Sequence, residues 1–153
     1  MFYHETCESL CGIVHDPLAR LLKGISSNAG LFSNANDLAI FAQTILNKGK
    51  YGDVVVFSPL TVFQMTKVYP LVKFSGRGLG WDIFTDYSSN RGDIFSVGSY
   101  GHTGFTGTPM WIDPETEAFV IILTNRAHLP RGNVVRLRGV VANIVGGSIV
   151  EVE

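Results

Sequence analysis

The sequence predicts an α+β fold in which an antiparallel sheet is flanked by helices. Amphipathic helical patterns fill the segment before Pro70, strand patterns fill most of 79–125, and a helical pattern returns after Asn133. A chain of 153 residues is long enough for one domain with a core. We therefore expect a single domain over 1–153. Its expected parts are an irregular lead-in with a short helix in 1–35, helices in 36–68, antiparallel strands in 78–126 and a C-terminal helix in 132–147.

The helices before residue 70 are marked by capping residues and by apolar spacing. A short helix follows Asp16, which suits a cap, and Pro17, which suits the first turn. A longer helix begins in the polar segment 33–37 and ends near Gly49. Its apolar side chains recur at helical spacing: Leu38, Phe41, Ala42, Ile45 and Leu46. A third helix is predicted over 58–67, with serine as its cap and proline in its first turn.

The strand patterns are separated by turn-rich segments at 88–92 and 113–117. The strands that they predict are 79–84, 93–99, 106–113 and 118–125. The run 119–123 is apolar without alternation, which favours a central strand that is buried on both faces.

The last helix is predicted to start at Asn133 as its cap and to end at Gly146. Its expected inward residues are Val134, Leu137, Val140, Val141, Ile144 and Val145. The densest group of basic residues is Arg131, Arg136 and Arg138. We interpret these three arginines as the solvated face of this helix.

The composition excludes several classes of function. A net charge of -1 argues against a nucleic-acid-binding surface. No apolar run reaches the roughly 18–20 residues that a membrane-spanning helix needs. Residues 1–5 contain neither a basic nor an apolar signal region, so no signal peptide is predicted in this chain. Charged residues make up only 16%, which indicates apolar surface that another domain, a partner or a second copy covers.

The most informative segment is 101–108, with the sequence GHTGFTGT, followed by the apolar strand 109–113. Glycine lets a ligand or a second backbone approach closely, because no Cβ stands in the way. The threonines supply hydroxyls, and unpaired backbone N–H groups at a strand edge can hold a carbonyl or a carboxylate. These features are typical of the wall of an acyl-transfer site.

Four patches in this order resemble the C-terminal half of the serine β-lactamase and penicillin-binding-protein-like hydrolases. They are GIVHD at 12–16, NAGLFS at 28–33 with DLAIFA at 37–42, GLGW at 78–81, and GHTGFTGT at 101–108 with WIDP at 111–114 and LTNR at 123–126. The resemblance runs from about residue 5 to the C-terminus. It implies that the chain is the C-terminal portion of a β-lactamase or transpeptidase-like fold.

The resemblance also implies a reaction and a set of substrate-binding residues. Family members hydrolyse an amide or ester through an acyl-serine, and the substrate would be a β-lactam, a peptidoglycan peptide or a small ester. The third motif of the family faces the substrate carboxylate and completes the oxyanion hole. The matching substrate-binding residues are His102, Thr103, Gly104, Phe105 and Thr106, with the backbone N–H of Phe105 as the oxyanion donor.

The nucleophile motif of the family is absent from this sequence. No serine has a lysine three positions later, and the nearest match pairs Ser88 with Arg91, which is a poor base. Tyr87-Ser88-Ser89 fits the family's Tyr-x-Ser pattern formally, but we interpret it as a turn. We therefore expect no catalytic residue in this chain and no activity from the chain alone. The missing N-terminal half of the fold, which would precede residue 1, is its expected partner.

Two other interpretations stay open. One is a non-catalytic module of the same fold that holds a ligand or partner at the 102–106 edge. The other is a zinc-binding interaction domain, because His4, Cys7, Cys11 and His15 have spacing that suits one metal ion. We favour structural roles for these four residues and expect no metal and no cofactor.

The remaining expectations concern assembly and location. Without the first part of the fold, a sheet edge and an apolar face would be exposed, so we expect a homo-oligomer that forms through the sheet edge. Family members are often exported to the cell envelope or periplasm, and nothing in this sequence assigns a compartment.

Overall fold

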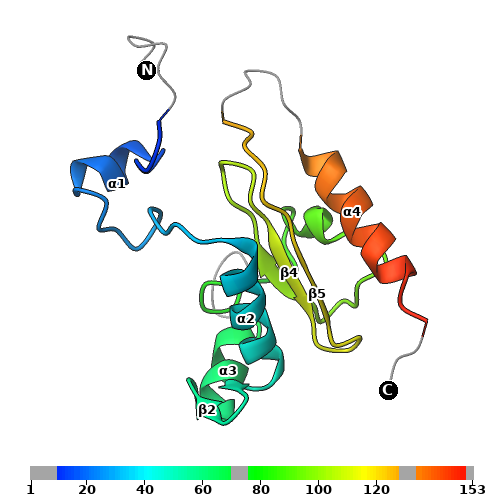
Figure 1. Cartoon of the computed structure of the whole chain (residues 1–153). Coiled ribbons are helices and arrows are strands. Elements are labelled where there is room, and N and C mark those ends of the chain that lie inside the picture. The colour runs from blue at the N-terminus through cyan, green and yellow to red at the C-terminus, as the bar shows by residue number, and fades with distance from the viewer. Residues whose placement is uncertain (1–9, 70–75, 128–133, 151–153) are drawn as a thin grey trace. The chain divides into compact units, whose positions relative to one another are not determined.

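The computed structural model describes residues 10–69, 76–127 and 134–150 (Figure 1). The chain divides into two compact units, Met1–Asn34 and Ala35–Glu153, and each is described here by itself. Helices accompany two small antiparallel sheets, so the α+β fold class is confirmed. The expectation of a single domain stays a prediction.

The first unit contains the short helix α1, Pro17–Leu21. The side chain of Asp16 caps it by accepting a hydrogen bond from the Ala19 amide at 2.8 Å. This bond, followed by a side-chain hydrogen bond from Asn28, lowers the pKa of Asp16 below its ordinary value. Lys23 and Gly24 take positive φ angles of 57° and 83°, which turns the chain away after the helix.

The second unit begins with helix α2, Ala35–Leu46, and a hairpin of β1, Lys50–Tyr51, and β2, Val54–Val55. The sequence patterns did not predict this hairpin, which turns through Gly52 at a φ of 56°. Helix α3, Pro59–Thr66, follows, and its cap Ser58 accepts from the Thr61 amide at 3.1 Å.

The main sheet has three antiparallel strands in the order β3-β4-β5. They are β3, Tyr100–His102, β4, Met110–Asp113, and β5, Ala118–Ile121. Trp111 of β4 lies opposite Gly101 of β3 and opposite Val120 of β5, which fixes the register. Within the described residues β4 is the central strand, so the prediction of a central strand at 119–123 is corrected.

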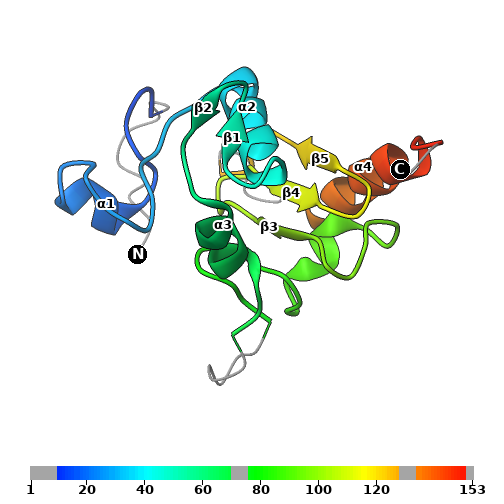
Figure 2. The ribbon, with the colours of Figure 1, turned by 90° about the horizontal axis from the view of Figure 1, so that it is seen from below.

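Helices cover both faces of the sheet, which explains the continuous apolar character of β5. Figures 1 and 2 show α2 on one side of β4 and β5 and α4, Val135–Gly147, on the other. Both helices contact β5. The core beside α2 contains Ala42, Ile45, Val62, Trp81, Ile83, Tyr100 and Ile112. The core beside α4 contains Phe95, Trp111, Val120 and Ala142.

Two predicted strands, 79–84 and 93–99, are irregular in the structure. Asp82 forms only isolated bridges, to Arg77 and Gly101. In the second segment the backbone amide of Ser96 donates to the Asp113 carboxylate at 3.0 Å instead of to a neighbouring strand. Side-chain acceptors of this kind compete with ladder formation, and hydrophobic patterns do not register them.

Helix α4 also differs from the prediction. Val141 and Val145 are half-buried and pack against the core, as predicted. Leu137, Val140 and Ile144, however, are 46%, 46% and 65% exposed, and the buried residues are Arg138, Ala142 and Gly146. The helix starts after Val134, which makes no side-chain cap, and the predicted cap Asn133 lies outside the described residues. The buried stripe of the helix is therefore made of small and polar residues, and Gly146 packs closely against Ile94 and Phe95.

The carboxylate of Asp113 holds the end of β4 through hydrogen bonds, and replacing Asp113 tests how much they stabilise the fold. Its buried carboxylate accepts from the Ser96 amide and hydroxyl and from the Glu115 amide at 3.1 Å. Burial raises the pKa of Asp113, but these hydrogen bonds outweigh burial and leave the pKa below its ordinary value of 3.8. Replacing Asp113 by alanine is expected to lower the free energy of unfolding by about 2–4 kcal/mol at neutral pH, because three donors lose their acceptor.

Urea unfolding at neutral pH and near pH 3 measures this effect. The folded-state pKa lies below the unfolded value, so the carboxylate stabilises the fold above the unfolded pKa, and this contribution is lost as the pH falls through the folded pKa. The free energies of unfolding of wild type and Asp113→Ala should therefore differ less near pH 3 than at neutral pH. The exposed Glu115→Gln variant serves as the control. If wild type and Asp113→Ala differ by the same free energy of unfolding at both pH values, this account is contradicted.

Candidate functional site

The five predicted site residues form a turn on the surface of the second unit, between β3 and β4. His102 closes the β3–β4 ladder opposite Met110. The Gly104 amide then donates to the Thr108 carbonyl and the Gly107 amide donates to the Gly104 carbonyl, both at 3.1 Å. The structure therefore places 102–106 in one tight segment, with Phe105 66% exposed.

Gly104 packs closely against Thr108 inside this turn. A Cβ atom there would lie 2.3 Å from the Thr108 hydroxyl oxygen. At Gly101 a Cβ would lie 2.2 Å from the Met110 carbonyl oxygen and 2.5 Å from the Trp111 ring. The small residues of the motif thus let β3 lie directly against β4 and keep the following turn compact.

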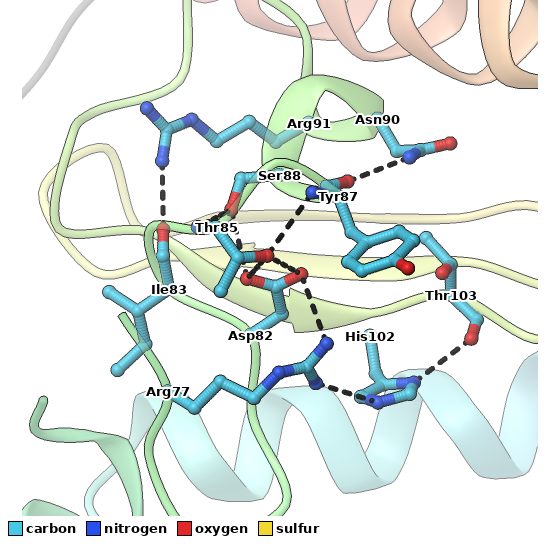
Figure 3. Close-up of polar contacts among 10 residues, drawn as sticks. All are labelled: Arg77, Asp82, Ile83, Thr85, Tyr87, Ser88, Asn90, Arg91, His102 and Thr103. Carbon is cyan, nitrogen blue, oxygen red and sulfur yellow. Dashed lines mark hydrogen bonds and ion pairs between the residues drawn. The ribbon is translucent and has the colours of Figure 1, made fainter. Parts of the chain in front are cut away.

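The imidazole of His102 is held in one orientation (Figure 3). Its Nδ1 lies 2.9 Å from the Thr103 carbonyl oxygen, which can only accept a hydrogen bond. Its Nε2 lies 3.2 Å from Nη1 of Arg77, which can only donate. The neutral tautomer with the proton on Nδ1 satisfies both contacts. In this arrangement His102 links Arg77 to the backbone of the motif, and its Nε2 lone pair is already used.

Arg77 is in turn held by the buried carboxylate of Asp82. Nη2 of Arg77 lies 3.8 Å from Oδ2 of Asp82. Oδ2 also accepts from the Thr85 hydroxyl, and Oδ1 accepts from the Ser88 hydroxyl, both at 2.9 Å. The backbone of Asp82 exchanges two hydrogen bonds with Gly101, at 2.7 and 2.9 Å. Asp82 therefore joins the start of the motif to the arginine that contacts His102.

Sequence reasoning missed Arg77 and Asp82. The two residues flank the GLGW patch at 78–81. A charged residue on each side of a glycine-rich patch was the available signal. The patch bends so that Arg77 and Asp82 form an antiparallel bridge.

Two more arginines contact the backbone of the motif. Nη2 of Arg138 donates to the Gly104 carbonyl at 3.1 Å, and Nη1 of Arg126 lies 3.5 Å from the Phe105 carbonyl. The Arg126 guanidinium also lies 5.2 Å from the centre of the Phe105 ring. Arg138 is only 4% exposed, so its interpretation as part of a solvated face is wrong. Burial, followed by the charge of Arg126, lowers the pKa of Arg138.

The segment closest to a nucleophile pattern has a structural role. Ser88–Arg91 forms a 3-10 turn, in agreement with the interpretation of Tyr87-Ser88-Ser89 as a turn. The Ser88 hydroxyl donates to Asp82, and the Arg91 guanidinium donates to the Ile83 carbonyl at 3.0 Å (Figure 3). Ser88 is only 5% exposed, so its hydroxyl is shielded from a substrate, and Arg91 makes its hydrogen bond with a carbonyl and not with Ser88.

The metal hypothesis is not tested by the structure. His4 and Cys7 lie outside the described residues, and Cys11 is exposed. Over 10–69, 76–127 and 134–150, no group of three or more potential ligands comes together. A hollow in the first unit lies among residues between Gly12 and Phe32, and none of the predicted substrate-binding residues 102–106 lines it. No helix in the described ranges has the length and apolarity that crossing a bilayer requires.

The chemistry of the segment 102–106 follows from the groups on its surface and from the contacts that hold it. A partly exposed guanidinium, that of Arg77, and threonine side chains lie at a segment whose backbone Arg138 holds by a hydrogen bond. Donors fixed in this way suit a substrate with a carboxylate and a carbonyl that develops negative charge.

Comparison with known proteins gives a family match over most of the chain. Residues 9–142 match the family model described as Beta-lactamase. Proteins of Salmonella paratyphi B, Salmonella newport and Salmonella heidelberg, provisionally named D-alanyl-D-alanine carboxypeptidases, are each 41% identical to the chain over 128 residues. The match covers 82% of this chain and 29% of each relative, so the chain spans less than a third of the length of these relatives.

Proposed function

Because the chain belongs to the beta-lactamase family, we propose that it forms the substrate-facing wall of a serine hydrolase. The observation that carries this proposal is the braced segment 102–106 at the end of β3, with Arg77 and Asp82 behind His102. The reaction would be the hydrolysis of an amide or ester through an acyl-serine. Among β-lactams, peptidoglycan peptides and small esters, the names of the relatives favour peptides that end in D-alanyl-D-alanine.

In this proposal the chain binds and polarises the substrate. A serine oxygen bonds to the substrate carbonyl carbon, and the carbonyl oxygen becomes an oxyanion that accepts from the Phe105 amide. The carbon–nitrogen bond breaks, and the serine proton leaves on the amine. Water then bonds to the acyl carbon, the serine ester bond breaks, and the serine regains a proton.

Arg77 and Thr103 would hold the substrate carboxylate during these steps. The Arg77 side chain is 40% exposed, so part of its guanidinium is accessible although it contacts His102 and Asp82. Thr103 directly follows the strand and is half-buried. A fixed guanidinium suits a carboxylate better than a flexible ammonium does.

The nucleophile has to come from another segment, since this sequence has no Ser-x-x-Lys. A chimera provides it: the 128 matched residues of the Salmonella newport relative are replaced by the matching residues of this chain. We expect the chimera to release D-alanine from a D-alanyl-D-alanine peptide. Thr103→Val should lower kcat/KM by about 10- to 100-fold, because a hydrogen bond to a charged group is lost.

The control is Thr61→Val, which removes an exposed hydroxyl on α3 and should leave kcat/KM unchanged. A folded chimera without any turnover, under conditions in which the relative itself is active, would reject the proposal and favour the non-catalytic module.

A further inference from the structure

Hydrogen bonds to the oxygen of the peptide group between Gly104 and Phe105 affect how strongly the N–H of the same group donates. Its oxygen is the Gly104 carbonyl, and its N–H is the proposed oxyanion donor. Two donors converge on that oxygen: the Gly107 amide and Nη2 of Arg138, each at 3.1 Å. One of these donors carries a full positive charge.

Arg138 is an unusual residue at this position. It is 4% exposed, and in the described parts of the chain it has no carboxylate within ion-pair distance. Its guanidinium instead donates to neutral oxygens, Oδ1 of Asn90 at 3.3 Å and the Gly104 carbonyl. Burying a charge without a counter-charge is costly. Stabilisation of the fold therefore does not by itself explain why an arginine is buried at this position.

The orientation of the guanidinium is fixed by Asn90. Asn90 is itself 5% exposed, and its Nδ2 donates to the Tyr87 carbonyl at 2.7 Å, which leaves its Oδ1 for Arg138. Helix α4 and the turn Ser88–Arg91 pack against each other, so both ends of this arrangement are anchored. The positive charge of Arg138 is thus held beside the Gly104 carbonyl.

A charged donor on a carbonyl strengthens the N–H of the same peptide group as a hydrogen-bond donor. Charge-assisted hydrogen bonds are about twice as strong as neutral ones. Hydrogen bonds in series also polarise one another in a low-dielectric environment. A donor at Gly104 therefore increases the partial positive charge at the Phe105 amide hydrogen.

We propose that Arg138 is a positioning residue that orients and polarises the Gly104–Phe105 peptide group, so that the Phe105 amide stabilises the oxyanion. This inference rests on the proposed function for the role of that amide. The polarisation itself is a property of this chain and is measurable without a nucleophile.

The test compares isotope-labelled Arg138→Gln, Arg138→Lys and wild-type chains by NMR. Arg138→Gln should shift the Gly104 carbonyl carbon and the Phe105 amide nitrogen upfield, and Arg138→Lys should restore much of the shift. The control Arg136→Gln, an exposed arginine on the same helix, should leave both resonances in place. Unchanged Gly104 and Phe105 resonances in a folded Arg138→Gln chain would overturn the proposal.

The lysine variant keeps the test decisive if Arg138→Gln fails to fold. A lysine can lose its proton at alkaline pH, whereas an arginine cannot. The Phe105 amide should therefore titrate with the lysine in Arg138→Lys and stay constant over the same range in wild type. A purely structural role for Arg138 predicts no such titration, and its absence would overturn the proposal.

Kinetics of the chimera separate this inference from the proposed function. Arg138→Gln should lower kcat about tenfold with little change in KM, since the polarised amide acts mainly in the transition state. An active chimera with unchanged kcat in this variant overturns the inference and leaves the function standing. A wild-type chimera without activity overturns the function, and the NMR shifts still decide whether Arg138 polarises the peptide group.

Discussion

Replacing Phe105 by proline is expected to lower kcat/KM of the chimera by about 10²- to 10³-fold, the usual cost of one oxyanion donor. Proline has no backbone N–H, so the substitution removes the donor itself. Phe105→Ala keeps the N–H and removes only the ring, which is 66% exposed and lies beside Arg126. The alanine variant should therefore keep most of the activity.

The comparison of these two variants isolates the backbone donor. Circular dichroism checks that the proline variant is folded, because proline also restricts the backbone of Gly104. An α-hydroxy acid at position 105 removes the N–H without introducing the proline ring, and it measures the contribution of the N–H to kcat/KM independently. Equal kcat/KM for Phe105→Pro and Phe105→Ala, or an α-hydroxy-acid variant as active as wild type, would contradict the assignment of Phe105 as oxyanion donor.

Replacing Trp111 by alanine is expected to lower the free energy of unfolding by about 3–5 kcal/mol. Trp111 is 1% exposed in the central strand and packs in the core beside α4 with Phe95, Val120 and Ala142. Its removal leaves a cavity that the strands on both sides cannot close without breaking the ladder. The same substitution should also remove the packing contact between Gly101 and the indole ring.

Urea unfolding with three variants tests this prediction. Trp111→Phe should cost much less than Trp111→Ala, since it keeps an aromatic ring and removes an indole N–H that has no partner among the described residues. Val97→Ala, at a side chain that is 70% exposed, should change the free energy of unfolding by less than about 0.5 kcal/mol. A loss below about 1 kcal/mol for Trp111→Ala would place Trp111 outside the cooperative core.

The parts of the site that the sequence predicts are those made by neighbouring residues. The run 101–108 is recognisable because its glycines and threonines are contiguous, and its turn is closed by contacts inside the run. Asp16 and Ser58 are recognisable as caps for the same reason, because each accepts from an amide three residues later.

The remaining features depend on contacts between distant residues. Arg77 meets His102 across 25 positions, and Arg138 meets Gly104 across 34. An arginine in a helical pattern is ordinarily assigned to the solvent side, since arginine is seldom fully buried. Only the fold shows that Arg138 is buried and that Leu137 is exposed. The sequence of 93–99 predicts a strand, because no local pattern shows that the Ser96 amide donates to the Asp113 carboxylate.

Intact mass after incubation with a reactive penicillin tests most directly the claim that this chain supplies the wall of the site and not the nucleophile. The chain alone and the chimera are treated in parallel, and any adduct is mapped to its residue. We predict no adduct on the folded chain and one stoichiometric adduct on the chimera, at a serine outside the part taken from this chain. A stoichiometric adduct on a serine of the chain alone would contradict the account, because the chain would then carry its own nucleophile.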